Sequence, residues 1–213
     1  AYNLGFNTNT NVSVQGGNET TTFYTSLSYK YMNGTLPNNS FDRLSFLAKA
    51  SHKITKDVEL EASINFANSN PKNAQPSIGE FFVDTNNGPL GAMYDTQHWR
   101  NYYKAEHGGR VNSSYGDKYG RVPGMGLWWS IYENEYTQKE TTVRPTLTLR
   151  WDLTDWLKFT AEGNYNYYMR RAENKQPNDG YAKSTGGYYR MEQYQKEQTN
   201  LNASFSWNKT FGD

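Results

Sequence analysis

Cysteine is absent from the 213 residues. A disulfide scaffold, a thiolate metal site and a cysteine nucleophile are therefore excluded within this sequence. Long apolar runs are missing as well, since no stretch approaches the roughly 18 residues that a transmembrane helix needs. The formal net charge is only +1, which provides no basic excess for displacing the counterions of a nucleic acid. We therefore expect no nucleic-acid partner.

Aliphatic residues are scarce, whereas aromatic residues are abundant. Leu, Ile, Val and Phe together account for 34 of the 213 residues. Such a low fraction indicates disorder only when it is combined with high net charge. Here the charge is nearly balanced and aromatics reach 16%, with 18 Tyr and 6 Trp. Disordered chains are depleted in such rings, so we expect a folded chain.

Alternation of apolar and polar residues is the dominant pattern. Between residues 2 and 15 the even positions carry Tyr, Leu, Phe, Thr and Val, and the odd positions carry mostly Asn, Gly and Ser. Successive side chains of a strand point to opposite faces, so the segment is predicted to be a strand with one apolar face. Seven segments share this pattern, namely residues 2–15, 21–31, 42–52, 58–68, 141–151, 157–169 and 199–211.

The lengths of the strands and of their connections indicate a membrane barrel. Several of the predicted strands have about eleven residues, close to the 9–11 that cross a bilayer when tilted. Short connections at 16–19, 53–57 and 152–156 alternate with long ones, the longest spanning residues 69–140. Short periplasmic turns and long extracellular loops are typical of outer-membrane barrels. The sequence therefore predicts an all-β, up-and-down antiparallel segment of a transmembrane barrel, whose long loops face outward.

Two features of the strands have alternative readings. Trp151, Trp156 and Trp207 cluster near the short turns, where an aromatic girdle would lie, although such rings can also stiffen hairpins. A soluble β-sandwich would alternate in the same way, but it needs a second apolar layer, which the long loops do not offer. Pro145 cannot donate to a ladder, so a local distortion is expected there.

Several motifs resemble one family of outer-membrane proteins. They are residues 11–17 (NVSVQGG), 23–29 (FYTSLSY) with a loop containing Gly34, 41–46 (FDRLSF), the turn at 53–57 and the closing 208–212 (NKTFG). In order and spacing they resemble the barrel of the SusC/RagA family, TonB-dependent transporters of Bacteroidota. The resemblance covers nearly the whole chain except the long loop.

The resemblance implies a larger assembly than residues 1–213 can form. It implies a 22-stranded barrel, an N-terminal plug, a TonB box and a SusD-like surface lipoprotein. Plug and box are not expected within this sequence, which we interpret as one partial barrel domain that seven strands cannot close. The expected function is import of glycans or oligopeptides across the outer membrane of a Gram-negative bacterium by a multi-pass protein that contacts lipid and the TonB complex. A passive porin, or a surface glycan-binding or adhesin barrel, is the alternative.

No catalytic residue, metal site or cofactor is expected. The three histidines show no metal-ligand spacing, and turnover chemistry is not predicted. Charged residues on the polar faces are instead expected to point into the lumen and hold the plug, a role favoured over substrate steering. These residues are Arg43, Lys49, Glu59, Glu61, Arg144, Arg150, Lys158 and Glu162. Lys49 and Glu61 are predicted to face each other, in a register whose paired positions sum to about 110.

The long loop is the expected seat of specificity. Loops of this length in compact proteins are normally functional or disordered. Exposed rings offer apolar faces to sugar C–H groups, which favours glycans within the import hypothesis. The candidate substrate-binding residues are Trp99, Tyr102, Tyr103, Trp128 and Trp129. The competing interpretation is that such rings form the loop's own small core or pack against the partner lipoprotein.

Overall fold

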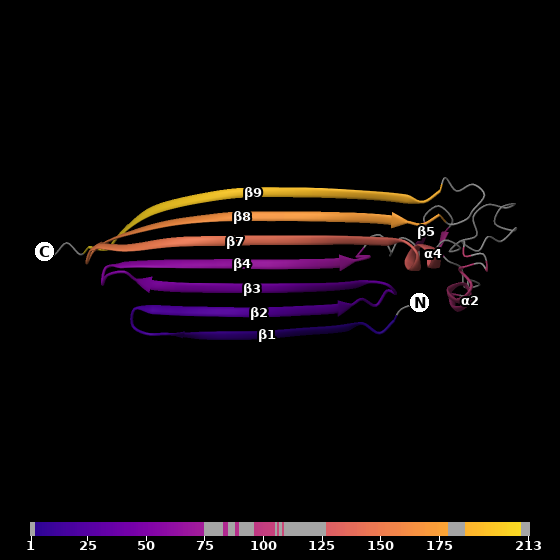
Figure 1. Cartoon of the computed structure of the whole chain (residues 1–213), viewed down its shortest axis with the longest axis horizontal. Coiled ribbons are helices and arrows are strands. Elements are labelled where there is room, and N and C mark those ends of the chain that lie inside the picture. The colour runs from indigo at the N-terminus through magenta and orange to yellow at the C-terminus, as the bar shows by residue number, and fades with distance from the viewer. Residues whose placement is uncertain are drawn as a thin grey trace.

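The computed structural model describes residues 3–74, 83–84, 88–89, 96–104, 106, 108, 127–178 and 186–209. Seven long strands form one antiparallel sheet in the order β1-β2-β3-β4-β7-β8-β9, each beside its neighbours in sequence (Figure 1). Their bounds are Phe6–Gly17 (β1), Thr21–Asn33 (β2), Ser40–Lys53 (β3), Val58–Lys72 (β4), Glu135–Thr154 (β7), Leu157–Gln176 (β8) and Tyr188–Trp207 (β9). The predicted all-β, up-and-down fold is confirmed.

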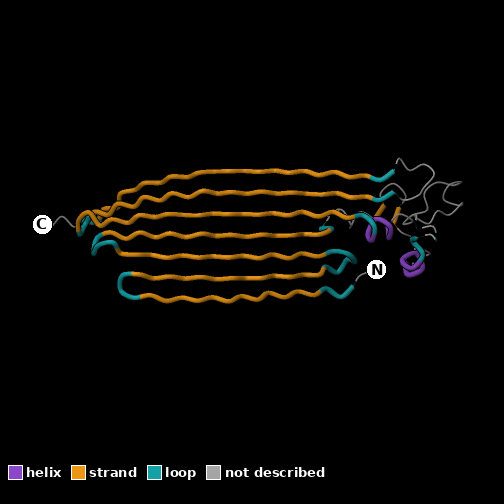
Figure 2. Tube along the Cα trace, in the orientation of Figure 1, coloured by secondary structure: helices purple, strands orange, loops and turns teal. Residues whose placement is uncertain are grey.

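Short elements gather at one end of the sheet. They are the strand pair β5 (Val83–Asp84) and β6 (Gly88–Pro89) and the helices α2 (Thr96–Asn101) and α4 (Leu127–Tyr132). Figure 2 shows both helices at the end of the sheet opposite the tight turns, with α4 beside the ends of the upper strands and α2 beyond them. The tight turns after β1, β3 and β7 lie at the opposite end (Figure 1). We call these two ends the loop end and the turn end. None of the helices in the described part of the chain is long and apolar enough to cross a membrane.

The strand register sorts the side chains onto two faces. We call the face that carries Val12, Leu27 and Leu147 the outer face, and the opposite face the inner face. From Val12 the printed pairs lead straight across the sheet through Leu27, Phe46, Phe66, Val143 and Tyr167 to Glu197. Large apolar side chains lie exposed along the outer face, with Leu147 at 53% and Leu201 at 80% exposure. An apolar patch of this extent requires a cover, because soluble monomers rarely leave one open.

The apolar band runs diagonally across the outer face. In β1 its part nearest the turn end is Val12 and Val14, with Phe6 further toward the loop end, and in β9 it covers residues 201–207. Following the paired residues from Val12 across the sheet leads to Glu197 in β9, four residues before the band begins at Leu201. Following them from Val14 leads to a position eight residues before the band ends at Trp207. The band is therefore displaced toward the turn end by six residues on average across the six strand pairs, which is one residue per pair. With about 3.3 Å per residue and about 4.8 Å between strands, this band is perpendicular to the axis of a barrel only when the strands are tilted by about 35° from that axis. This is the tilt of strands in membrane barrels.

The strands nearest the C-terminus are longer than the sequence pattern predicts. β7, β8 and β9 have 20 residues each, whereas residues 141–151, 157–169 and 199–211 were predicted. The prediction for β9 was wrong by eleven residues at its start. Beyond the apolar band both faces are polar, so the alternation fades although the ladder continues. β4 also reaches Lys72, so the connection predicted at 69–140 begins and ends within strands. The first strand starts at Phe6, not at residue 2, and extends to Gly17.

Two local expectations are refined by the register. Paired positions of β3 and β4 sum to 112, so Glu61 lies opposite Ser51 and the predicted direct pairing with Lys49 was wrong. The offset of two residues preserves the face of every side chain. At Pro145 the β7–β8 ladder skips Arg144 and Pro145 and resumes in the same register at Thr146. The expected distortion is therefore a gap in the ladder without a register shift.

Candidate functional site

An ion-pair network lies on the inner face near the turn end. Glu61 accepts from Lys49 Nζ at 3.0 Å and from Arg150 Nη1 at 3.2 Å, and Arg150 Nη1 also donates to Glu59 at 2.9 Å. The network joins β3, β4 and β7, with Thr148 buried at its centre opposite Glu61. The diagonal reach of Lys49 therefore forms the contact with Glu61 that was expected from direct pairing.

The other charges predicted to point inward share this face. Lys158 pairs with Asp152 at 3.3 Å, and Arg43 Nε donates to Ser45 Oγ at 3.2 Å. Arg144 and Glu162 also lie on the inner face, opposite Asn65 and Thr148 respectively. All eight predicted residues therefore project from one face, and contact with a plug stays a prediction.

A compact aromatic cluster is built at the loop end, which we call the loop cluster. Trp128 of α4 is fully buried and stacks on Tyr132, with ring centroids 5.8 Å apart. Tyr103 packs on Tyr132 at 5.2 Å and meets the edge of Trp129 at 6.4 Å. Ile131 completes this small core. Trp128 and Trp129, at 0% and 5% exposure, form the interior of the loop, so their expected availability to substrate was wrong.

Cations and one carboxylate surround the loop cluster. The Arg100 guanidinium lies 5.5 Å from the centre of the Trp128 ring and donates to the Tyr132 hydroxyl at 2.8 Å. Glu133 accepts from the Tyr103 hydroxyl at 2.9 Å and from Lys104 Nζ at 3.2 Å. Burial, reinforced by the Glu133 carboxylate, raises the pKa of Tyr103 to about 12. Tyr103 therefore stays a neutral donor throughout the physiological range.

Three asparagines tie the loop cluster to the sheet. Asn38 Nδ2 donates to the Ile131 carbonyl at 3.1 Å, which fixes the end of α4 over the β2–β3 connection. Asn73 exchanges hydrogen bonds with Tyr136, its backbone N–H donating to the Tyr136 carbonyl and its Oδ1 accepting from the Tyr136 N–H, both at 2.7 Å. Asn39 Nδ2 donates to the Asn73 carbonyl at 2.9 Å. Asn38 thus ties α4 to the β2–β3 connection, and Asn39 and Asn73 join this connection to the end of β4 and the start of β7.

Of the two remaining loop candidates, the structure describes the side chain of Tyr102 but not that of Trp99. Tyr102 is 60% exposed and rests against the His98 ring at 4.9 Å, so its ring is available to a ligand. Trp99 belongs to α2, but its side chain lies outside the described residues. Within the described part of the chain, no group of three or more His, Cys, Asp or Glu could hold a metal ion.

A second group of inner-face residues, at the loop end of β7, β8 and β9, was not found from the sequence. We call it the upper-wall cluster, and it consists of Gln138, Glu140, Tyr168, Arg170, Glu192, Tyr194 and Lys196. Register places Glu140, Arg170 and Tyr194 side by side, with Tyr168 beside Lys196 in the next row. The rings of Tyr168 and Tyr194 lie 6.1 Å apart, and Arg170 Nη2 reaches Glu192 at 3.9 Å. The strands predicted from the sequence covered residues 141–151, 157–169 and 199–211. Most of the upper-wall cluster therefore fell into predicted loops.

The upper-wall cluster can bind polar chains. Two tyrosine rings supply apolar faces with polar edges, and Tyr194 is half exposed. Arg170 and Lys196 supply cationic donors, while Glu140 and Glu192 supply acceptors. A surface that offers both charge signs beside aromatic rings suits a ligand that carries both signs itself.

Comparison with known proteins gives matches among solved structures only. No family model matches the sequence, and no curated protein matches it. Among solved structures, a chain of the RagAB peptide importer in its "open-open" state is similar, with a TM-score of 0.68 and 14% sequence identity. The match covers 93% of this chain and 21% of that one. The chain thus spans about a fifth of the length of that solved chain, and the likeness is one of fold.

Proposed function

We propose that the seven strands form part of the wall of an outer-membrane importer. The observation that carries the proposal is the outer apolar band, whose diagonal course across the register suits strands tilted by about 35° in a bilayer. The fold likeness to a chain of a peptide importer over 93% of these residues supports it. The inner face, lined by Asn, Ser, Thr and charged residues, suits the wet lumen of such a barrel.

A bilayer requires the sheet to close. Backbone groups left unpaired in hydrocarbon cost several kcal/mol each, so open sheet edges do not occur there. β1 and β9 are the two edges of the described sheet. In the proposed barrel both edges pair with further strands, and the network of Lys49, Glu59, Glu61 and Arg150 holds a plug at the turn end.

Oligopeptides are the proposed cargo. The aromatic rings that favoured glycans were mainly those of the loop, and Trp128 and Trp129 are buried. The upper-wall cluster instead presents Arg170 and Lys196 together with Glu140 and Glu192. A peptide carries carboxylates and amines that match both signs, whereas a neutral glycan has only hydroxyls to hydrogen-bond and no charge to pair with either sign. Glycan import is the competing outcome.

The proposed importer works with partners at both membrane faces. At the loop end, a SusD-like surface lipoprotein covers the loop cluster and delivers cargo to the upper wall. At the turn end, the TonB complex supplies energy through the plug. Tyr102, the exposed ring that precedes Tyr103 of the loop cluster in the sequence, is the proposed lipoprotein contact.

Uptake by cells that express the full-length protein tests the proposal. Cells lacking other peptide importers receive labelled oligopeptides or neutral oligosaccharides, with and without TonB. We expect TonB-dependent peptide uptake, and about tenfold weaker half-saturation for the double variant Arg170→Gln/Tyr194→Ala, equal to about 1.4 kcal/mol. Tyr24→Ala, an inner-face tyrosine at the turn end, is the matched control and should change uptake by less than about twofold.

Each other outcome has a defined meaning. TonB-independent entry of both solutes would indicate a passive porin, and surface binding without entry would indicate an adhesin. Uptake of the oligosaccharide alone, unaffected by the double variant, would replace the peptide by a glycan. Any of these results would overturn the import of peptides.

A further inference from the structure

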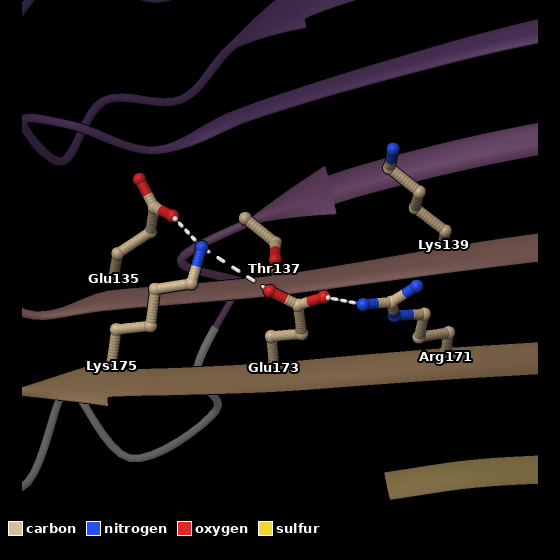
Figure 3. A pocket seen from close by; sticks show the side chains of 6 residues that line it. All are labelled: Glu135, Thr137, Lys139, Arg171, Glu173 and Lys175. Atoms are coloured by element: carbon tan, nitrogen blue, oxygen red, sulfur yellow. Dashed lines mark hydrogen bonds and ion pairs between the residues drawn. The ribbon is translucent and has the colours of Figure 1, made fainter. Parts of the chain in front are cut away.

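A charged pocket lies on the outer face of β7 and β8, on the same side as the apolar band. Its volume is about 320 Å³. It is lined by Glu135, Thr137, Lys139, Arg171, Glu173 and Lys175 (Figure 3). All six have odd numbers, like Leu147 and Tyr167 of the same strands, and the register between Glu135 and Asp152 contains no shift that would change their face. The pocket therefore opens outward, away from the lumen.

The position of the pocket is the layer just beyond the apolar band. The last apolar outer residue of β8 is Met169, and Arg171 follows two residues later. In β7, Lys139 comes four residues beyond Val143. With a rise of about 3.3 Å per residue and a tilt of about 35°, these two cations start roughly 5 to 11 Å above the last apolar row. Head groups occupy about 5–8 Å on each side of the hydrocarbon core.

Two cationic residues are direct cross-strand neighbours in this pocket. Lys139 pairs directly with Arg171 in the β7–β8 ladder. Like charges directly opposite on one face destabilise a sheet, so this arrangement does not serve the fold. Lys139 has no hydrogen-bond or ion-pair partner among the described residues, whereas Arg171 Nη2 donates to Glu173 at 2.6 Å. A guanidinium has five N–H donors, so others remain for a ligand.

The rest of the pocket is a chain of ion pairs that ends at Arg171. Lys175 Nζ bridges Glu135 at 3.1 Å and Glu173 at 3.2 Å, as the dashed lines in Figure 3 show. Lys72 of β4 approaches Glu135 at 3.8 Å from the neighbouring strand. Four cations against two carboxylates leave an excess of two positive charges. One doubly charged anion between Lys139 and Arg171 would neutralise this excess.

We propose that this outer-face pocket binds the phosphorylated head group of an outer-leaflet glycolipid. Lys139 and Arg171 contact the phosphate, and the Glu135–Lys175–Glu173 chain positions Arg171 and lines the space taken by the adjoining sugar. The depth favours a lipid, because acyl chains attached to this head group run down the apolar band beside Tyr165 and Tyr167. The inference rests on the placement of the outer face in the outer membrane that is proposed above.

The test measures lipid binding to the purified full-length protein in detergent by native mass spectrometry. The probes are bisphosphorylated lipid A, the same lipid with its phosphates removed, and inorganic phosphate. We expect the wild type to bind bisphosphorylated lipid A at least tenfold more tightly than Lys139→Gln/Arg171→Gln does. Dephosphorylated lipid A should bind both proteins equally weakly, and the charge-retaining Lys139→Arg/Arg171→Lys should bind within about threefold of the wild type.

The controls separate this site from general charge and from import. Lys53→Gln/Lys56→Gln removes the same two charges at the turn end and should leave lipid A binding unchanged. Equal affinities of wild type and Lys139→Gln/Arg171→Gln, or an equal loss in the turn-end variant, would overturn the site. Micromolar binding of inorganic phosphate without a preference for phosphorylated lipid would also overturn it. Peptide uptake by the same variants reports separately on import, which should persist when only the lipid site is lost.

Discussion

Tyr103 is held by two aromatic rings and a carboxylate, and its hydroxyl is the most perturbed donor of the loop cluster. Its pKa of about 12 lies above the ordinary tyrosine value of about 10. Because the folded state keeps the proton longer than the unfolded state, the hydroxyl's contribution to stability is complete below pH 10 and is lost as pH rises through 12. The tyrosinate absorbance of wild type minus Tyr103→Phe should therefore titrate near pH 12. A difference midpoint near 10 would show that Tyr103 is solvated.

Glu61 is the centre of the inner-face network, since it accepts from both Lys49 and Arg150. Its side chain is 17% exposed, so neutralising the carboxylate leaves two cations close together with little water around them. We expect Glu61→Gln to lower the free energy of unfolding by about 1 kcal/mol. The control is Lys158→Gln, whose pair with Asp152 is solvated on both sides and should be worth less than about 0.5 kcal/mol. Denaturant unfolding of the full-length protein in bilayers measures both, and equal losses would refute a special role for Glu61.

At the scale of the element, the β1–β2 turn depends on one glycine. Gly17 has φ +155°, and an added Cβ would lie 2.3 Å from the Thr21 carbonyl oxygen. Asn18 Oδ1 closes the turn by accepting from the N–H groups of Thr20 and Thr21 at 3.0 and 2.8 Å. Gly17→Ala should therefore cost about 1–3 kcal/mol of unfolding free energy.

A matched glycine controls for the loss of flexibility in that variant. Gly163 lies in the middle of β8, and an added Cβ would meet only the Leu201 side chain, at 3.1 Å. Leu201 can shift because it is 80% exposed, so Gly163→Ala should change stability by less than about 1 kcal/mol. If the two variants unfold at the same denaturant concentration, the backbone of the turn is not under the constraint described.

Within the apolar band, the strands could be predicted from the sequence because one face carries apolar side chains and the other carries polar ones. Leu147 and Thr148 therefore separate cleanly by alternation alone. Beyond the band both faces are polar, so nothing in the pattern distinguishes Arg170 from Arg171, although the first lies on the inner face and the second on the outer face. Only the ladder, which extends to Gln176, assigns these faces. The upper-wall cluster and the outer pocket were missed for this one physical reason.

The loop aromatics could not be assigned from the sequence for a different reason. Trp128 and Tyr102 are both large rings in one polar loop, but one is fully buried and the other is 60% exposed. The difference depends on long-range contacts, such as that between Arg100 and Trp128 and that between Asn38 and Ile131. No local pattern encodes which ring becomes the core of such a loop.

At the scale of the whole molecule, the proposed barrel places the two ends of the sheet on opposite sides of the outer membrane. Tyr102 at the loop end and Ile54 at the turn end are both well exposed, at 60% and 57%. Residues 1–213 contain no cysteine, so a single cysteine introduced at either position is the only thiol in this part of the protein. A membrane-impermeant thiol reagent should label Tyr102→Cys in intact cells and Ile54→Cys only after the outer membrane is opened. The reverse order would invert the orientation.

The central claim is that lipid covers the outer face, and one pair of variants tests it most directly. Leu147 is the midpoint of the apolar stretch of β7 and faces outward, whereas its neighbour Thr146 faces inward. The measurement is the unfolding free energy of the full-length protein folded into bilayers, for Leu147→Arg and for Thr146→Arg. A cation at the bilayer midplane costs about 2–4 kcal/mol, so Leu147→Arg should lose that amount and Thr146→Arg less than about 1 kcal/mol. If the outer face met water, Leu147→Arg would stay within about 0.5 kcal/mol of the wild type, and that result would contradict the account.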